Sequence, residues 1–414
     1  MGIARAPALA LVTGLGLLLG ASGAGAVAPA VTCGATLTKS TTLSKDLHCQ
    51  GTALVIGADG ITVNLAGHTI SGTNAAGGEG IASDGHANVQ IVSGRITDFR
   101  LNGVGIRGGS GNVVRGVTIR RIGAGGVEGE PVSAGIALVG SPGGRIVGND
   151  VANDVDAYQA DGADVLNSPG SVVQANRLDR NSWNGLALFG SPGSRITGNE
   201  LDGNKHHGTE VNGGSDSAVV AGNVADGNAG IGIVLGSARD ARVVGNSAAR
   251  NDLGLFFFDL HDSLISGNST RANRNGIELF GGQFGSDGNR LIANVANGNA
   301  ETGIGLSLGA NDNLVSGNVA NENQAPVGEG GGIYVEASTG NQLVANVANR
   351  NLDSGIVFYE DEPGDAAGNS LKANTTIRNA NHGIDAVVGT LDGGRNRASG
   401  NATPPQCRNV VCSN

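Results

Sequence analysis

The sequence predicts an all-β fold, a solenoid built from stacked coils of short parallel strands. The main observation is a unit of about 23 residues that recurs from residue 104 to 395, with the pattern G-[IL]-x-L, then x-[IV]-x-G-N-x-x-x-x-N. A fixed period of this length is typical of a solenoid, in which each unit buries its apolar face only by stacking on its neighbours. Composition agrees, since glycine is abundant (73 of 414 residues) and aromatic residues make up 3%.

The first element of each unit is a short strand that starts at a turn glycine. In Gly135-Ile136-Ala137-Leu138, the apolar side chains alternate with a small residue. Alternation with a period of two places Ile136 and Leu138 inward and the middle residue outward. The same pattern recurs at residues 185–188, 276–279 and 355–358.

A second strand follows, as in residues 195–198, and then a pair of asparagines five residues apart. The pairs are Asn176/Asn181, Asn199/Asn204, Asn223/Asn228, Asn246/Asn251, Asn268/Asn273, Asn294/Asn299, Asn318/Asn323, Asn346/Asn351 and Asn374/Asn379. Asparagine tolerates the left-handed conformation that corners need, and stacked amides can bond to the coils above and below. These asparagines are therefore expected to be structural.

The unit is too short for a helix-bearing repeat and lacks the leucine-rich consensus. The chain resembles the right-handed parallel β-helix superfamily of pectate lyases, polygalacturonases and mannuronan C5-epimerases, and most of all its NosD-type branch, over about residues 50–400. The resemblance implies a single right-handed parallel β-helix of about 12 coils. We expect an N-terminal cap and first coils at residues 27–103, the repeats at 104–396 and a C-terminal cap at 397–414.

Both ends of the chain point to export. Residues 1–26 have the arginine, the apolar core and the small-residue cleavage site of a signal peptide, which predicts a secreted, extracellular protein. The four cysteines form two close pairs, Cys33/Cys49 and Cys407/Cys412, which we expect to be disulfides that pin the end coils.

The formal net charge of −10 argues against a nucleic-acid partner and mildly against a polyanionic ligand. We expect a monomer with no membrane contact after signal cleavage. We expect no cofactor and no metal-ligating histidine cluster. The alternative is Ca²⁺ in the acidic turn at residues 361–365, although its spacing matches no known calcium loop.

The first candidate site comes from aligning the coils on their turn glycines. The alignment brings side chains of three consecutive coils onto one outward face, with a central row that runs Asp164, Ala187, Glu210, Gly232, Phe256 and Glu278. The site residues on this face are Asp161, Asp164, Trp183, His207 and Glu210, with Tyr158 and His206 nearby. We expect Asp164 and Glu210 to be a carboxylate pair about 10 Å apart, near the separation in inverting glycosidases. We expect His207 to orient a partner, and Trp183, Tyr158 and Glu278 to contact substrate. The alternative is a solvated face with a few chance acids.

The second candidate is the run from Phe256 to Asp262, which is similar to the Tyr-Gly-x-Asp-Pro-His-Asp motif of mannuronan C5-epimerases. The resemblance implies that Asp259, His261 and Asp262 lie at a uronate. Leu260 replaces the proline, and Phe256 replaces the tyrosine that transfers a proton in that family. A phenyl ring cannot transfer a proton. The alternative is an enlarged turn whose aspartates bond backbone amides.

These observations support two hypotheses for function. The first is that the protein binds or processes an extracellular polysaccharide. The second is a non-catalytic surface, adhesive or structural binding protein. The sequence leaves open whether the chain is an enzyme; if it is, the expected reaction is that of a polysaccharide hydrolase or of a lyase or epimerase.

Overall fold

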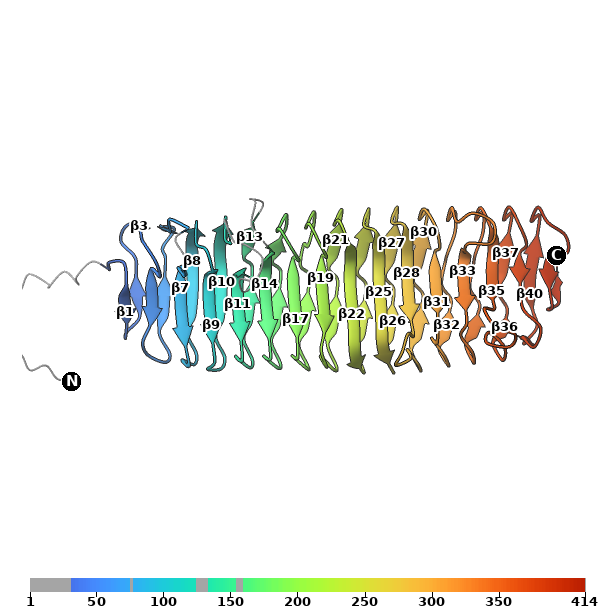
Figure 1. Cartoon of the computed structure of the whole chain (residues 1–414), viewed down its shortest axis with the longest axis horizontal. Helices are drawn as coiled ribbons and strands as arrows, with labels where there is room; N and C mark the ends of the chain where they lie inside the picture. The colour runs from blue at the N-terminus through green and yellow to red at the C-terminus, as the bar shows by residue number, and fades with distance from the viewer. Residues whose placement is uncertain (1–30, 75–76, 124–132, 154–158, 414) are drawn as a thin grey trace, which may run out of the picture. The chain divides into compact units, whose positions relative to one another are not determined.

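The computed structural model describes residues 31–74, 77–123, 133–153 and 159–413, and these residues form one solenoid of parallel strands (Figure 1). They contain 42 strands and no α-helix, so none of them forms a helix that could cross a membrane. The predicted right-handed parallel β-helix is confirmed. The predicted signal peptide, residues 1–26, lies outside the described residues.

The largest face is a sheet of 16 parallel strands, one from each coil. Its strands in order are β1 (Ala35–Leu37), β4 (Leu54–Ile56), β7 (Ile81–Asp84), β9 (Asn102–Arg107), β11 (Ser133–Val139), β14 (Ala160–Leu166), β17 (Leu186–Phe189), β19 (Thr209–Asn212), β22 (Ile231–Arg239), β25 (Leu253–His261), β28 (Asn275–Phe280), β31 (Ile304–Ser307), β33 (Gly331–Glu336), β35 (Ser354–Tyr359), β38 (Ile384–Asp385) and β41 (Cys407–Arg408). We call this the first sheet.

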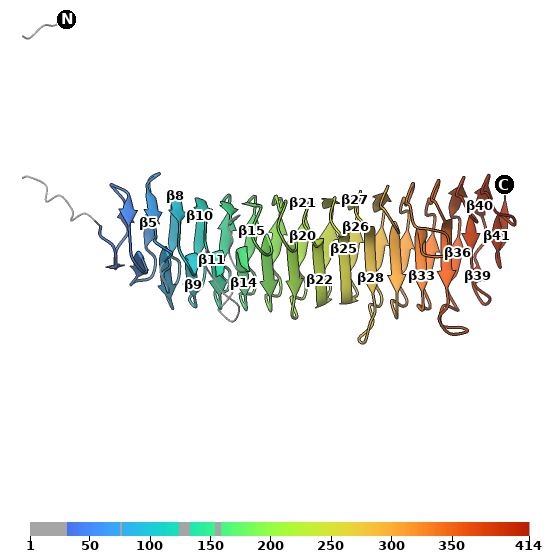
Figure 2. The same ribbon diagram turned by 45° about the horizontal axis from the view of Figure 1, so that its top comes forward.

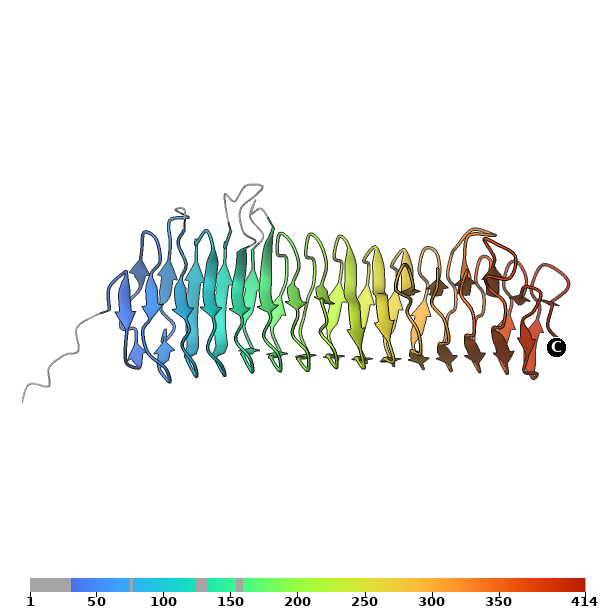
Figure 3. The same ribbon diagram turned by 60° about the horizontal axis from the view of Figure 1, so that its bottom comes forward.

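The second face of the coil is built from shorter strands, which the turned views show stacked beside the first sheet (Figure 2, Figure 3). They are β2 (Thr41–Thr42), β5 (Thr62–Asn64), β8 (Gln90–Thr97), β10 (Val113–Arg120), β12 (Arg145–Val147), β15 (Val172–Gln174), β18 (Arg195–Thr197), β20 (Val219–Ala221), β23 (Arg242–Val244), β26 (Leu264–Ser266), β29 (Arg290–Ile292), β32 (Leu314–Ser316), β34 (Gln342–Val344), β36 (Ser370–Lys372) and β39 (Leu391–Asp392).

A third face closes the coil, and β8 and β10 run round the corner into it. Its remaining strands are β3 (Leu47–His48), β6 (Thr69–Ser71), β13 (Asp150–Ala152), β16 (Arg177–Leu178), β21 (Val224–Asp226), β24 (Ser247–Ala249), β27 (Ser269–Arg271), β30 (Val295–Asn297), β37 (Thr375–Ile377), β40 (Asn396–Ser399) and β42 (Cys412–Ser413). Some coils have no full strand on this face. In those coils, Glu200, Val319 and Val347 pair with the neighbouring coils through isolated β-bridges, so the third face is continuous.

The number of coils differs from the predicted 12. Twelve strands of the first sheet, β9 to β38, fall within the repeated region, but β1, β4 and β7 precede it and β41 follows it. These outer coils lack the asparagine pair, so the repeat pattern does not reveal them. Sixteen coils at ~4.8 Å make a stack of roughly 70 Å, longer than the 55–60 Å that 12 coils would give.

The core is the inside of the coil. In β11, Ile136 and Leu138 have no exposed surface, and in β28 the same is true of Ile277 and Leu279. This inward alternation was predicted from the glycine-led pattern. Longer loops leave the stack after β28 and β35 (Figure 2).

The asparagine pairs form two continuous ladders of buried amides. At Asn246 the backbone N–H and the side-chain NH₂ both donate to Oδ1 of Asn268, at 2.9 and 3.0 Å, and the NH₂ also donates to the carbonyl of Val220 at 2.9 Å. The amide of Asn223 donates in turn to Oδ1 of Asn246. Equivalent bonds link Asn149 to Asn396 along one ladder and Asn153 to Asn401 along the other. The structural role predicted for these residues is confirmed.

Disulfides join Cys33 to Cys49 and Cys407 to Cys412, with Cα–Cα distances of 5.5 and 6.1 Å. Both pairings agree with the sequence prediction. They lie in the first and last coils, each of which has a neighbour on one side only.

We expect Asn246→Ala to lower the free energy of unfolding by on the order of 1–3 kcal/mol, because it leaves the buried N–H of Asn223 and the carbonyl of Val220, both in the preceding coil, without this partner. Urea denaturation measures the change. The control is Arg242→Ala, an exposed position of β23 in the same coil, which should be nearly neutral. Equal midpoints for the two variants would contradict the role assigned to the ladder.

Replacing Cys33 and Cys49 together by serine should cost about 3 kcal/mol of local stability, since that bond closes a loop of sequence separation 16. Hydrogen exchange followed by mass spectrometry should show lost protection in β1 and β4. Protection in the middle of the stack, at β22 and β25, should stay at the wild-type level, since each coil contacts only its neighbours. Loss of protection along the whole stack would contradict this local effect.

Candidate functional site

The outward side chains of the first sheet form a central row that crosses the coils in strict register. The paired positions are Ala137, Asp164, Ala187, Glu210, Val234, Phe256, Glu278, Gly305, Tyr334, Val357, Asp385 and Arg408. The row agrees with the alignment on turn glycines except at one coil, where Val234 and not Gly232 pairs with Glu210. Two glycines, Gly230 and Gly232, precede apolar residues in this coil, and counting from the first of them shifts the alignment by two residues.

Asp161 and Asp164, both in β14, form a buried carboxyl pair. Their exposed fractions are 3% and 7%, and a hydrogen bond joins the two side chains. Burial, followed by the charge of Asp164, holds the pKa of Asp161 well above its usual range. Burial also raises the pKa of Asp164 to about 6. Like charges this close cannot both ionise, so the pair holds one proton near neutral pH.

One oxygen of this pair has no partner among the described residues. Oδ1 of Asp164 is buried and accepts no hydrogen bond, whereas Oδ1 of Asp161 accepts from the backbone N–H of Asn184 at 2.7 Å. Asp161 is therefore fixed by the next coil, and Asp164 keeps a free acceptor. A buried carboxylate oxygen without a donor is costly, so this oxygen is an unsatisfied polar group of the site.

Glu210, in β19, lies two coils beyond Asp164, with Ala187 between them. The two strands are therefore about 10 Å apart, as the sequence predicted. Burial raises the pKa of Glu210, while hydrogen bonds with the Asn212 and Asn184 side chains oppose the rise. Ala187, which lies between them in the row, has a small side chain that is 4% exposed.

Beside the central row, Asn184 and His207 each accept a hydrogen bond from a backbone N–H group of the following coil. Oδ1 of Asn184 accepts from the N–H of His207 at 3.1 Å, and Nδ1 of His207 accepts from the N–H of Ile231 at 2.9 Å. A ring nitrogen that accepts has no proton, so the neutral His207 ring carries its proton on Nε2. Burial, and then the neighbouring His206, lowers the pKa of His207 to about 4. His207 is therefore a neutral donor near pH 7.

Trp183, His206 and His207 form a stack of rings beside the carboxyl groups. The centroids of Trp183 and His206 lie 3.9 Å apart at an interplanar angle of 11°, and those of His206 and His207 lie 3.7 Å apart. Adjacent residues in a strand would face opposite ways, but His206 and His207 lie in a bend before β19 and their rings lie together. His206 covers one face of the indole, and Tyr158 lies outside the described residues.

The second candidate, Asp259, His261 and Asp262, lies at the end of β25 and just past it. His261 Nε2 lies 3.2 Å from Asp259 Oδ1, and both side chains are mostly buried, whereas the side chain of Asp262 is 64% exposed and lies 3.8 Å from Arg239. A shallow cavity of about 310 Å³ lies against Asp259 and His261. No enlarged turn is present, because β25 continues unbroken to His261.

Glu278 lies further along the central row, between Phe256 and Gly305. Its side chain is half-buried, accepts a hydrogen bond from Ser307 Oγ and has a pKa raised to about 7 by burial. Phe256 lies near Phe258 and Phe280, with centroid distances of 5.8 and 6.2 Å. Phe256 and Phe258 lie in the run that the sequence identified as the second candidate site, whereas Phe280 was not predicted as part of a site.

The acidic turn at residues 361–365 bonds to itself. Oδ2 of Asp365 accepts from the backbone N–H groups of Asp361 and Glu362, at 3.1 and 2.9 Å. Within the part of the chain that the structure describes, no three His, Cys, Asp or Glu side chains are grouped so that they could hold a metal ion.

Comparisons with known proteins give one family and a set of structures. The family model described as periplasmic copper-binding protein (NosD) matches residues 126–283 and 261–391. No curated protein matches the chain.

The similar solved structures share 12–17% identity with this chain. The Dettilon tailspike protein is 17% identical, with 78% of this chain and 63% of that chain covered and a TM-score of 0.47. The periplasmic alginate epimerase AlgG is 15% identical over 82% and 76% (TM-score 0.40). PfbA, a surface adhesin of Streptococcus pneumoniae, is 12% identical over 73% and 85% (TM-score 0.49). The chain thus spans less than two thirds of the tailspike protein.

The raised pKa of Asp164 predicts how stability depends on pH. An aspartate in the unfolded chain titrates near 3.9, whereas Asp164 in the folded protein titrates near 6. The folded state therefore binds more protons between these values, so the free energy of unfolding falls as pH rises from about 4 to about 6. Asp164→Asn should reduce that fall by on the order of 2 kcal/mol.

Urea denaturation at a series of pH values measures this slope. Asp240→Asn, which removes an exposed carboxylate at another turn, is the control and should keep the wild-type slope. If Asp164→Asn also kept that slope, Asp164 would not titrate with a raised pKa.

Proposed function

This chain belongs to the family of the periplasmic copper-binding protein NosD, and from that premise and the geometry of its first sheet we propose that it hydrolyses a polysaccharide outside the cytoplasm. The observation that best supports this proposal is a set of three carboxyl groups on one face of neighbouring coils, those of Asp161, Asp164 and Glu210. The strands that carry Asp164 and Glu210 are about 10 Å apart, near the separation of roughly 6.5–9.5 Å between the two carboxyl groups of inverting glycosidases.

The two sides of the site have different protonation states. The Asp161–Asp164 pair keeps a proton near neutral pH and can give it from Asp164 to the glycosidic oxygen as the bond to the anomeric carbon breaks. Glu210, when ionised, takes a proton from the water whose oxygen forms the new bond to that carbon. One water is consumed, and each carboxyl group is restored when solvent protons re-equilibrate.

The neighbouring side chains position the sugar. His207 presents a neutral Nε2–H, which suits a hydroxyl acceptor on the substrate, and its ring is held by the bond from Ile231. Trp183 is partly exposed and supplies an apolar surface beside the carboxyl groups.

Two observations support a location outside the cytoplasm. Both disulfides are of a kind that persists in oxidising compartments. The matching family model is described as periplasmic. We therefore propose a periplasmic or extracellular protein, with residues 1–26 as a cleaved signal peptide.

The residues present do not fit the copper that the family description names. All four cysteines are in disulfides, and the single methionine is residue 1, so the described residues offer no thiolate or thioether, the soft ligands of Cu(I). His206 and His207 lie together, but Nε2 of the neutral His207 ring holds a proton and cannot coordinate. We therefore derive no step that involves copper.

A second candidate function is glycan binding without catalysis. It is favoured by the burial of Asp161 and Asp164, since exposed fractions of 3% and 7% leave little surface for a substrate to reach. In that case the carboxyl pair would be structural, and Trp183 and Glu210 would carry the contact with the sugar.

A polysaccharide panel, assayed for new reducing ends and for absorbance of unsaturated uronates, should identify a substrate that is hydrolysed. Asp164→Asn and Glu210→Gln keep side-chain shape and remove a proton carrier, so each should lower kcat about 100-fold or more while circular dichroism shows an unchanged strand content. Asp240→Asn should keep full activity.

Other outcomes would reassign the function. Full activity in both site variants with loss in His261→Ala would move the site to Asp259 and His261. Binding without turnover, weakened by Trp183→Ala, would establish the non-catalytic function. Unsaturated products would replace hydrolysis by elimination.

A further inference from the structure

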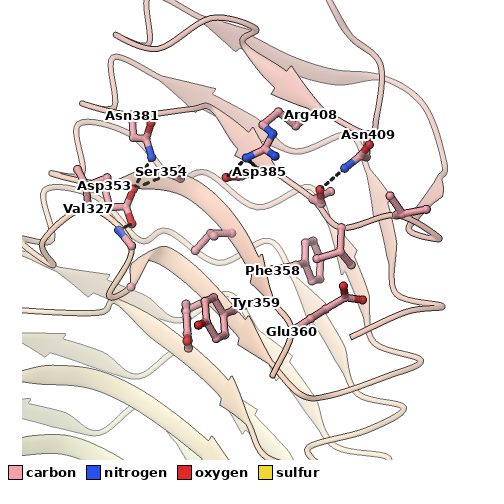
Figure 4. A pocket seen from close by; sticks show the side chains of 17 residues that line it. Val327, Asp353, Ser354, Phe358, Tyr359, Glu360, Asn381, Asp385, Arg408 and Asn409 are labelled. Carbon is pink, nitrogen blue, oxygen red and sulfur yellow. Dashed lines mark hydrogen bonds and ion pairs between the residues drawn. The ribbon is translucent and has the colours of Figure 1, made fainter. Parts of the chain in front are cut away.

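A second cavity lies at the C-terminal end of the same face, five coils beyond Glu210 and roughly 24 Å from it. Its volume is about 450 Å³, within the range of small-molecule sites. Figure 4 shows Tyr359, Glu360, Asp385 and Arg408 around it, and Tyr334 from the central row also lines it.

The walls of the cavity are held by hydrogen bonds within the protein. Asp353 is buried, accepts from the N–H of Gly328 at 2.8 Å and accepts from the side chain of Asn381 at 2.9 Å. At the other side, Asn409 donates to the carbonyl of Ala386 at 2.7 Å. These bonds tie loops from successive coils together, so the cavity is formed before a ligand binds.

The rim of the cavity is apolar and open. Val327 is 63% exposed, Val388 is 80% exposed and Tyr359 is 46% exposed. Large exposed apolar side chains around a concave site are typical of ligand contact. An aromatic ring at such a rim offers its face to a sugar ring or to a cation.

The charge inside the cavity is negative. Its lining includes the carboxylates of Asp353, Glu360 and Asp385 and one cationic side chain, Arg408, which pairs with Asp385 at 3.1 Å. The hydroxyl of Tyr334 bonds to Glu336, and burial together with that acid raises the pKa of the phenol. The tyrosine therefore stays neutral and adds no charge to the cavity.

The rest of the face has the same sign. The central row from Ala137 to Arg408 contains the carboxyl groups of Asp164, Glu210, Glu278 and Asp385, and its one cation is the paired Arg408. Burial raises the pKa of the first three, so these acids become negative only as pH rises, and near the cavity the charge comes from Glu360 and Asp385. A polyuronate on this face would place carboxylates against carboxylates, which costs free energy. A sugar that bears an ammonium group would instead gain attraction to the acids and to the tyrosine rings.

We propose that the cavity between Tyr359, Glu360 and Asp385 is a binding subsite for an ammonium-bearing sugar unit, so that the polysaccharide is an amino-sugar polymer and not a polyuronate. This inference rests on the proposed function in one respect, namely that the ligand of the protein is a glycan. Binding at the cavity does not require that Asp164 and Glu210 catalyse hydrolysis.

Isothermal titration calorimetry at mildly acidic pH, where sugar amines are protonated, tests this subsite with the full chain. The probes are hexamers of β-1,4-linked glucosamine, of its N-acetylated form and of a uronic acid. The glucosamine hexamer should bind at least about tenfold tighter than the N-acetylated one, and the uronate hexamer should not bind.

Variants then locate the binding. Tyr359→Ala should weaken the glucosamine hexamer about 2- to 30-fold, and Tyr359→Phe, which keeps the ring face, should bind like wild type. Glu360→Gln should weaken binding and reduce its dependence on salt. Glu322→Gln, at an exposed ion pair with Arg350 away from the cavity, is the matched control and should leave affinity unchanged.

The outcomes separate the two proposals. A glycan that binds with dependence on Glu210 but not on Tyr359 or Glu360 would overturn the subsite and leave the proposed function standing. Binding of the glucosamine hexamer that depends on Tyr359, with no glycan hydrolysed, would support the subsite and contradict hydrolysis. Preferred binding of the uronate hexamer would overturn the subsite.

Discussion

The hydrogen bond from one asparagine amide to the next coil is the interaction on which the rest of the structure depends. Each ladder amide donates forward to the Oδ1 of the following asparagine and backward to a carbonyl of the preceding coil, as at Asn246. These bonds satisfy backbone groups that would otherwise be buried and unpaired at the corner. They also fix the register, because a shifted coil would lose the bonds of two corners together.

Fixed register is what allows a functional face to exist. Asp164, Ala187 and Glu210 come from separate coils, yet each occupies the same position on the outward side of the first sheet. The separation of the two carboxyl groups is therefore set by the stacking distance and not by a loop. The same register carries the acidic character of the face on to Glu278 and Asp385.

Stacking also decides which acids are perturbed. Asp161 and Asp164 are three residues apart in one strand, where simple alternation would put them on opposite sides, but they share a hydrogen bond and are buried together. Glu210, with the same local pattern, is only half-buried and keeps side-chain hydrogen bonds. The difference arises from what each coil packs against. As a result, one face holds a buried pair that keeps a proton, Asp161 and Asp164, and a more exposed proton acceptor, Glu210.

The family of this chain is described as copper-binding, but the residues of the candidate site do not fit a copper ion. The chain has the repeat of the NosD family, but its cysteines are all in disulfides and the ring nitrogen of His207 is used by a backbone N–H. Membership of the family therefore does not by itself place a metal site on this chain. This is expected of a fold in which strand spacing, and not particular surface residues, provides stability.

The sequence by itself determined the parallel β-helix, the two disulfides, the buried role of the asparagine pairs and the two-coil spacing of Asp164 and Glu210, because each follows from a period that is visible in the chain. Only the tertiary structure decided the number of coils, since the outer coils lack the asparagine pairs. It also decided which residue of β22 lies in the central row, Val234, and how the rings of His206 and His207 stack, since neither follows from counting residues after a glycine. It also decided the burial of Asp161 and Asp164 and the C-terminal cavity. These depend on how loops from different coils pack together, and such contacts between distant residues leave no periodic trace in the sequence.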